Sequence, residues 1–285
     1  MTSNPATLIG FVAVILWSFL ALFTVGTAPM PALLLNAICF AIGGTLGLIW
    51  TAKSGGLGQL RSVPFWVYGF GTIGLFGYHA LYFSALRLAP AAEAGLIAYL
   101  WPLLIVLFSG LLPGEQLKRS HVFGAIVAFA GAALIVQGGG EGFKAEALPG
   151  YALAFGCALF WSGYSVISRR LGDVPTAAVA VFCLASSALS LGLHFALETA
   201  QWPVGLLGWG SVIALGLGPV GLAFFVWDIG VKKGDIQLLG TSSYAAPLLS
   251  TGVLILAGIA DPSWTLAVAA LLVTGGAYLA ARANS

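Results

Sequence analysis

Apolar residues fill long, nearly unbroken stretches of this chain, and most charged residues lie in the short segments between them. A membrane-spanning helix needs about 20 mostly apolar residues. Ten stretches meet that requirement, so the pattern predicts an all-α polytopic membrane protein with ten transmembrane helices. The predicted spans are residues 6–27, 32–50, 64–86, 92–111, 121–137, 150–168, 176–197, 207–231, 237–259 and 264–281.

One motif of ten residues occurs twice in the chain. Residues 95–104 read GLIAYLWPLL and residues 240–249 read GTSSYAAPLL, with the tyrosine, the proline and the following two leucines in the same places. The spans fall into two groups of five, and because five is odd, the second group is expected to enter the membrane in the opposite direction. We therefore predict two inverted five-helix repeats, residues 1–138 and 145–285, that form one integral membrane unit.

The repeated proline predicts a weak point in each half, because proline inside a helix removes a backbone hydrogen bond. Pro102 and Pro247 lie mid-span, and in the repeat register Gly74 of the third span lies opposite Pro219 of the eighth. Irregular backbone at membrane depth is tolerated only against protein or beside a wet cavity. We expect a cavity beside these four residues, which would serve as flex points for gating. Packing kinks without that role are the alternative.

Polar and aromatic side chains gather on the same predicted spans and supply hydrogen-bonding groups and flat apolar faces with little fixed charge. His79 is the one histidine well inside a span, and ionisable groups within membranes usually face the protein interior and serve function. Packing between helices is the alternative for the aromatic rings, and a neutral, hydrogen-bonded ring is the alternative for His79. The candidate substrate-binding residues are His79, Tyr78, Tyr82, Tyr99, Trp101, Trp17, Trp161, Ser162, Tyr164, Ser243 and Tyr244.

Lysine and arginine positions predict the orientation, because cytoplasmic loops carry an excess of these residues. With the amino terminus in the cytoplasm, Arg87 and Lys144 are the two basic residues left outside. An even number of spans then places both termini in the cytoplasm. The basic residues expected inside are Lys53, Arg61, Lys118, Arg119, Arg169, Arg170, Lys232, Lys233 and Arg282.

Composition narrows the class of protein further. The chain is 60% hydrophobic and 7% charged, whereas soluble domains carry about 25% charged residues. The net charge of +2 gives no reason to expect a nucleic-acid partner. Cys39, Cys157 and Cys183 lie in apolar stretches and are expected to be small buried residues, with no metal site or disulfide. No pair of acidic or histidine side chains is placed together mid-span, so we expect neither an enzyme nor a cofactor.

Several motifs resemble the drug/metabolite transporter superfamily, and the EamA-type repeat in particular. They are the Trp-Ser pairs that begin at Trp17 and Trp161, the Tyr-x-x-Pro-Leu-Leu fourth span followed by Leu-Leu-Pro-Gly-Glu115, and the glycines Gly124 and Gly131 of the fifth span. Within that group the chain is most similar to the YddG-type exporters of aromatic amino acids. The resemblance implies two five-span halves and a transport function.

Together the residues and the resemblance predict a secondary transporter of the bacterial cytoplasmic (inner) membrane. We expect it to export amino acids, aromatic and other neutral ones, or similar small metabolites, by alternating access. Its expected partners are the small-molecule substrate and the lipid bilayer, and its expected working unit is a monomer. An exporter of drugs or quaternary cations and a passive metabolite channel are the alternatives.

Overall fold

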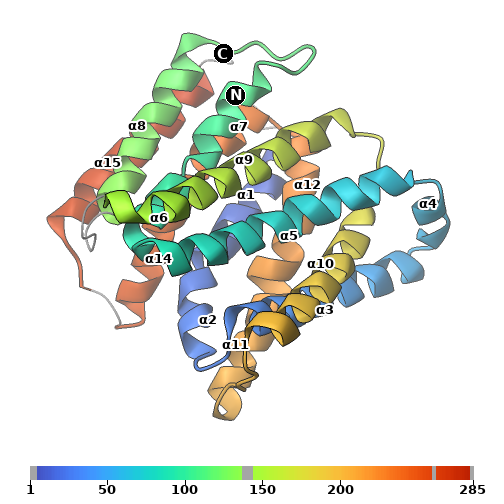
Figure 1. Cartoon of the computed structure of the whole chain (residues 1–285). Coiled ribbons are helices and arrows are strands. Elements are labelled where there is room, and N and C mark those ends of the chain that lie inside the picture. The colour runs from blue at the N-terminus through green and yellow to red at the C-terminus, as the bar shows by residue number, and fades with distance from the viewer. Residues whose placement is uncertain (1–4, 137–143, 259–260, 283–285) are drawn as a thin grey trace.

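The computed structural model describes residues 5–136, 144–258 and 261–282, and every regular element in these ranges is helical (Figure 1). The ends predicted at residues 137, 138 and 259, and the terminal residues 1–4 and 283–285, lie outside the described ranges. We call residues 5–136 the first half and residues 144–282 the second half.

The first half contains α1 (Pro5–Ser18), α2 (Leu20–Gly26), α3 (Ala32–Lys53), α4 (Leu57–Arg61), α5 (Phe65–Leu88), α6 (Ala91–Ala98), α7 (Trp101–Ser109) and α8 (Arg119–Val136). The second half contains the short 3-10 helix η2 (Ala145–Ala147), α9 (Leu148–Arg170), α10 (Ala178–Leu197), α11 (Gly205–Leu217), the π-helical segment η3 (Gly218–Leu222), α12 (Ala223–Lys233), α13 (Ile236–Ser242), α14 (Ala245–Leu256) and α15 (Trp264–Arg282).

Seven helical stretches of the described chain are long and apolar enough to cross a membrane: Pro5–Gly26, Ala32–Lys53, Ala145–Arg170, Ala178–Leu197, Gly205–Lys233, Ile236–Leu256 and Trp264–Arg282. The predicted third, fourth and fifth spans are not among them. Glycine, tyrosine and histidine make α5 less apolar than these seven, and Glu93–Ser109 and Arg119–Ile135 are shorter apolar helices. The chain is thus a multi-pass, all-helical membrane protein.

Helices of the two halves pack against each other in pairs: α1 with α12, α3 with α10, α5 with α9, and α8 with α15. Glycine permits the closest of these approaches. A Cβ atom added at Gly10 would lie 2.8 Å from the Cα atom of Gly230. Between α8 and α15, a Cβ atom added at Gly124 would lie 2.5 Å from the carbonyl oxygen of Gly276. Because lipid supplies no hydrophobic drive between helices, such close backbone contacts stabilise the bundle.

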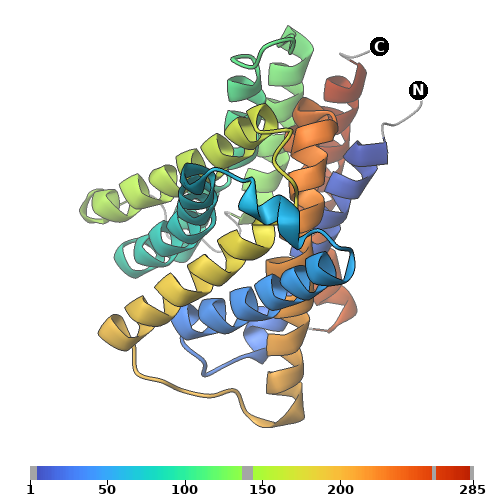
Figure 2. The same cartoon turned by 90° about the vertical axis from the view of Figure 1, so that its right-hand side faces the viewer.

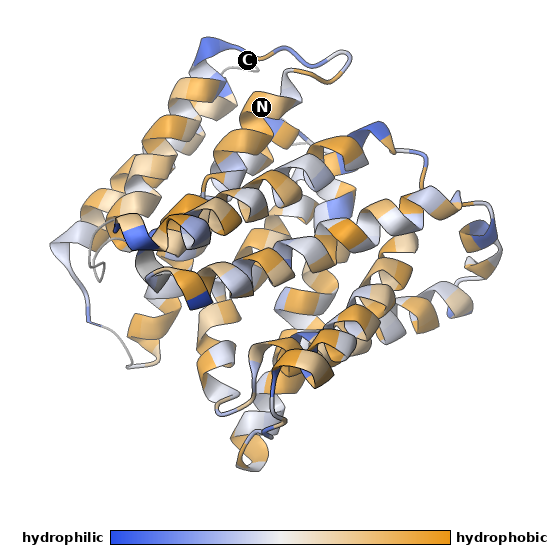
Figure 3. Cartoon of the chain, viewed as in Figure 1, coloured by the Kyte–Doolittle hydropathy of each residue, from blue (hydrophilic) through white to orange (hydrophobic). Residues whose placement is uncertain are grey.

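Along the helices most residues are apolar, whereas hydrophilic residues gather mainly at helix ends and connections (Figure 3). Large side chains such as Phe65, Leu206 and Leu256 are almost fully exposed, as expected for residues that face lipid. Figures 1 and 2 show that α1 begins and α15 ends at the same end of the molecule. We call this end the terminal end of the bundle.

Candidate functional site

Each repeated motif interrupts a helix. In the first half, α6 gives way to α7 after Ala98, and in the second half α13 gives way to α14 after Ser242. Each interruption lies within one helical turn before the motif's proline, Pro102 or Pro247. A proline ring clashes with the carbonyl four residues earlier, and its nitrogen has no hydrogen to donate. The two breaks therefore share one local cause.

The two breaks differ in the hydrogen bonds that their backbone makes with the other half of the molecule. The backbone N–H of Leu103 donates to the hydroxyl oxygen of Tyr244, at 3.0 Å. Tyr244 is 0% exposed, and its ring lies 5.8 Å from that of Phe129 on α8. The matching contact, between the hydroxyl of Tyr99 and the N–H of Leu248, does not form in the described structure, and Tyr99 is only partly buried. A tyrosine of the second half thus satisfies the broken backbone of the first half.

The other two predicted flex points have different local structures. Pro219 lies within the π-helical segment η3, and its carbonyl accepts a hydrogen bond from Nε1 of Trp17, at 3.1 Å. Gly74 lies in α5, which continues without a break from Phe65 to Leu88. A Cβ atom added at Gly74 would lie 2.5 Å from the ring of Tyr164, so this glycine lets α5 and α9 approach each other.

An aromatic cluster fills the space where α1, α7, α9 and α12 meet. The ring of Trp17 lies 6.1 Å from Trp101, 5.8 Å from Trp161 and 5.2 Å from Trp227. Trp227 is completely buried, and its Nε1 donates to Oγ of Ser165, at 3.1 Å. Trp227 is not among the residues predicted from the sequence, although it directly precedes the acidic Asp228. Three of the candidate residues, Trp17, Trp101 and Trp161, thus meet in one cluster.

A second group of candidates extends this cluster along α5 and α9. The rings of Tyr78 and Tyr82 are stacked at 6.1 Å, and Tyr78 lies 5.6 Å from Trp161. Tyr164 stacks on Trp161 at 5.4 Å. The aromatic surface therefore runs from the predicted first span to the predicted third, with hydroxyl groups among the rings.

His79 does not bridge two helices. Its Nδ1 lies 2.8 Å from the carbonyl oxygen of Leu75 in its own helix. A carbonyl only accepts, so Nδ1 carries the hydrogen, and in the neutral ring Nε2 is an acceptor. Phe40 and Phe224 pack against the ring at 5.1 Å and 6.3 Å. His79 therefore lies in an aromatic environment beside the cluster, because Phe224 also contacts Trp17.

The two candidate serines are bonded within their own helices. The hydroxyl of Ser162 donates to the carbonyl oxygen of Ala158, and that of Ser243 to the carbonyl oxygen of Leu239, both at 2.7 Å. Each is completely buried. In this structure both hydroxyl groups therefore donate within their own helices.

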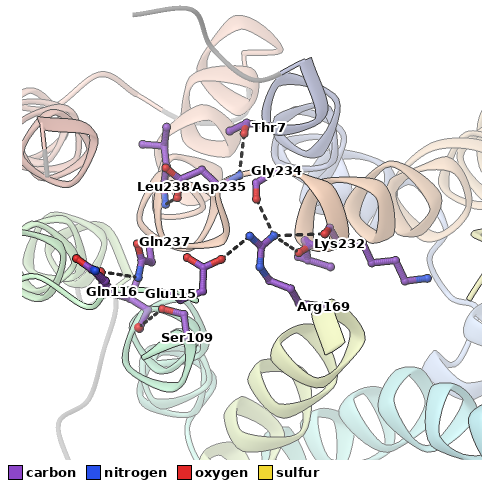
Figure 4. Close-up of polar contacts among 12 residues, drawn as sticks. Thr7, Ser109, Glu115, Gln116, Arg169, Lys232, Gly234, Asp235, Gln237 and Leu238 are labelled. Carbon is purple, nitrogen blue, oxygen red and sulfur yellow. Dashed lines mark hydrogen bonds and ion pairs between the residues drawn. The ribbon is translucent and has the colours of Figure 1, made fainter. Parts of the chain in front are cut away.

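A polar cavity of about 390 Å³ lies at the terminal end of the bundle. Its central contact is the ion pair between Arg169, at the end of α9, and Glu115, in the connection after α7 (Figure 4). Nη1 of Arg169 also donates to the carbonyl oxygens of Val231 (3.0 Å), Lys232 (3.4 Å) and Gly234 (2.7 Å). The cavity is lined by Gly114, Glu115, Gln116, Lys118, Arg169, Lys233, Gly234, Asp235 and Gln237.

Two further contacts hold this end together. Nε2 of Gln237 donates to the carbonyl oxygen of Gln116, at 3.3 Å, and the N–H of Asp235 donates to Oγ1 of Thr7, at 2.9 Å. In the sequence, Arg169 indicates only the orientation of the chain, and Glu115 is only part of a family motif. The carbonyl groups that Arg169 binds belong to the backbone, and every residue has such a group, so the sequence does not indicate this contact.

A different polar cluster lies at the opposite end, around Glu198 after α10. Its carboxylate accepts from the N–H groups of Leu33 (3.1 Å) and Leu34 (3.3 Å) at the start of α3. It also meets Nη2 of Arg87 at 3.4 Å and Nδ1 of His194 at 2.9 Å. A carboxylate at a helix amino terminus complements the helix dipole, so Glu198 ties α3, α5 and α10 together.

Matched broken helices inside an apolar helical bundle, with an aromatic and polar centre, are features of membrane transporters. The chain belongs to the EamA-like transporter family, which matches residues 4–137 and again residues 148–282. The family therefore occurs twice, as an internal repeat, and the resemblance seen in the sequence is confirmed. Because the family and the relatives below are transporters, the expectation that the chain is not an enzyme is confirmed as well.

The chain is similar over nearly its full length to proteins named aromatic amino acid exporter YddG. It is 55% identical to the one from Ancylobacter novellus over 284 residues, which are 98% of each chain. It is 28% identical to the one from Escherichia coli, over 98% of this chain and 97% of the relative. A crystal structure of a protein that is 54% identical superimposes with a TM-score of 0.94 and covers 99% of both chains.

Proposed function

We propose that this transporter exports amino acids, aromatic and other neutral ones, across the bacterial inner membrane. The observation that carries the proposal is the 55% identity, over 98% of both chains, to a protein named aromatic amino acid exporter. The aromatic cluster supports it, because stacked rings beside hydroxyl and indole N–H groups suit a flat apolar side chain. The candidate binding residues keep their proposed role as parts of this pathway.

The proposed topology has ten membrane crossings in two inverted repeats, with both termini in the cytoplasm. The repeated motif, the double family match and the pairing of helices across the halves support it. The start of α1 and the end of α15 at one end of the molecule agree with an even number of crossings. In this topology the terminal end of the bundle, which carries Arg169 and Lys118, is cytoplasmic. The proposed working unit is one chain.

The proposed mechanism is alternating access, in which the two halves exchange conformations. Inverted repeats permit this, since each half can adopt the arrangement now seen in the other. The hydrogen bond between Leu103 N–H and the hydroxyl of Tyr244 would break in the exchange, and Tyr99 would bond to Leu248. Pro102 and Pro247 supply the interrupted backbone at which this swap occurs, and Pro219 and Gly74 flank it.

An exporter of quaternary cations is less well supported. Such a site needs a carboxylate beside aromatic rings. Asp228 is close to the cluster in sequence, but its carboxylate is paired with Nζ of Lys232 at 2.9 Å and accepts from Oγ1 of Thr176 at 2.7 Å. The charge of Asp228 is thus balanced by Lys232, which leaves it poorly suited to bind a cationic substrate.

Reconstitution into liposomes tests the proposed function. Vesicles loaded with unlabelled phenylalanine should accumulate labelled phenylalanine by counterflow, whereas choline and nucleotide sugars inside should give no stimulation. Runs with and without a pH gradient separate proton-coupled from uncoupled transport. Uptake without any counterflow would support the passive channel instead. Absence of amino-acid transport by correctly inserted protein would reject the proposal.

A further inference from the structure

The cavity at the terminal end of the bundle is lined mostly by charged and amide side chains. We propose that it is a loading site for the α-ammonium and α-carboxylate groups of an amino acid, separate from the aromatic cluster. We further propose that the bound amino acid replaces the ion pair between Glu115 and Arg169. This inference rests on the proposed function and assigns the recognition of the zwitterion to this cavity.

The contacts around Arg169 close the cytoplasmic end between two groups of helices. Arg169 lies in the last turn of α9, which packs against α5, α6 and α7 and also touches α12. The carbonyls that Arg169 binds lie at the end of α12, whose main partner is α1. Gln237 and Gln116 cross the same boundary. Access from the cytoplasm to the space between these groups requires that Arg169 release the end of α12.

The lining offers a partner for each charge of a zwitterion. The guanidinium group of Arg169 can bind a carboxylate through two parallel hydrogen bonds. The carboxylate of Glu115 can accept from an ammonium group. Of the three carbonyls that Arg169 binds, that of Gly234 belongs to a lining residue, and it lies just after the carboxyl end of α12, where the helix dipole favours a cation. The carboxylate of an amino acid can therefore take the place of Glu115 beside Arg169, and its ammonium group can take the place of Arg169 beside Glu115.

The closed contact is suited to exchange because it is not sealed from water. The side chains of Arg169 and Glu115 are 23% and 20% exposed, and both line the cavity. Partly exposed ion pairs contribute little net stability. By contrast, the ion pair between Lys232 and Asp228 nearby is almost completely buried, with exposed fractions of 4% and 2%. Arriving substrate can replace the first pair without disturbing the second.

Kinetics measured separately from each membrane face test the proposal. Glu115→Gln and Arg169→Lys should each raise the KM for phenylalanine at the cytoplasmic face by about tenfold, the change expected when one charge-assisted hydrogen bond is lost. The KM at the opposite face should stay the same. Arg170→Lys is the matched control, because Arg170 donates to the carbonyl of Leu111 and does not line the cavity.

Competition by analogues that lack one charge separates the two roles. In the wild type, 3-phenylpropionate and phenylalanine amide should compete poorly with phenylalanine at the cytoplasmic face. Glu115→Gln should lose its discrimination against 3-phenylpropionate, which has no ammonium group. Arg169→Lys should discriminate less against the amide, which has no carboxylate, because lysine keeps the charge but cannot form two parallel hydrogen bonds. An unchanged analogue profile in both variants would overturn the proposal.

Chemical labelling of the wild type keeps the test valid if the variants fail to fold. Phenylglyoxal applied from the cytoplasmic face modifies arginine, and mass spectrometry reports each site. Phenylalanine should reduce modification of Arg169 several-fold and leave that of Arg170 unchanged; equal labelling overturns the loading site. If the wild type transports phenylalanine but neither the variants nor the labelling show the expected changes, the loading site alone is rejected. If the wild type transports no amino acid at all, the proposed function is rejected as well.

Discussion

The breaks at Pro102 and Pro247 have similar local sequences but different surroundings. The second half places Tyr244 completely inside the protein, with its hydroxyl bonded to the backbone of the first half. The first half leaves Tyr99 partly exposed, without the matching bond. A local motif therefore determines where a helix breaks, but the packing of the two halves determines which break is stabilised. Such asymmetry between repeats is what alternating access requires.

The largest difference between the two tyrosines is expected on truncation to alanine. Tyr244→Ala removes a completely buried ring that packs against Phe129, so it should destabilise the protein by about 3–5 kcal/mol. Tyr99→Ala should cost clearly less, because Tyr99 is partly exposed. Thermal unfolding of purified protein in detergent measures both. Equal losses of stability would show that the two surroundings are energetically the same.

Removal of the hydroxyl alone sharpens the comparison. Tyr244→Phe removes the acceptor of the partly buried Leu103 N–H, which should cost about 1–2 kcal/mol. Tyr99→Phe should leave stability unchanged. If transport uses the proposed swap, both variants should still lose transport rate, because each removes a contact of one state. A Tyr99→Phe variant with the wild-type rate would argue against the swap.

Replacement of each proline tests whether the breaks themselves matter. Pro102→Ala and Pro247→Ala restore a backbone N–H and allow a continuous helix. Each should slow phenylalanine transport by about tenfold, an increase of about 1.4 kcal/mol in the barrier. Initial rates of counterflow measure the effect, and Pro113→Ala, in the connection after α7, serves as the control. Wild-type rates in both variants would remove the flex-point role.

A small effect is expected at His79, which lies opposite Phe224 in the register of the repeat. The Nδ1 hydrogen bond of His79 stays within its own helix, and the matched residue is apolar, so His79→Leu should cost only about 1 kcal/mol of stability. Uptake by wild type and variant is compared between pH 5 and 8, the range in which histidine titrates. Identical pH profiles would show that His79 has a structural role only.

The sequence predicts much of this fold because its strongest signals are local. Apolar length indicates spans, and proline geometry breaks a helix regardless of the tertiary structure, so the breaks before Pro102 and Pro247 were predictable. The bond between Leu103 and Tyr244 was not, because it depends on how the halves pack. A tryptophan in an apolar stretch gives the same pattern whether it faces lipid or the centre, so the signal at Trp227 is limited to its place directly before Asp228. The carbonyl partners of Arg169 have no sequence signal at all.

The segment η3 has a consequence for the direction in which α12 presents its side chains. A π-helix accommodates one residue more per turn than an α-helix. One residue corresponds to a rotation of about 100° around the helix axis. Deletion of a single residue between Gly218 and Leu222 would therefore turn Trp227 away from Trp17 and carry Asp228 away from Thr176. The extra residue of η3 therefore determines which way the side chains of α12 point.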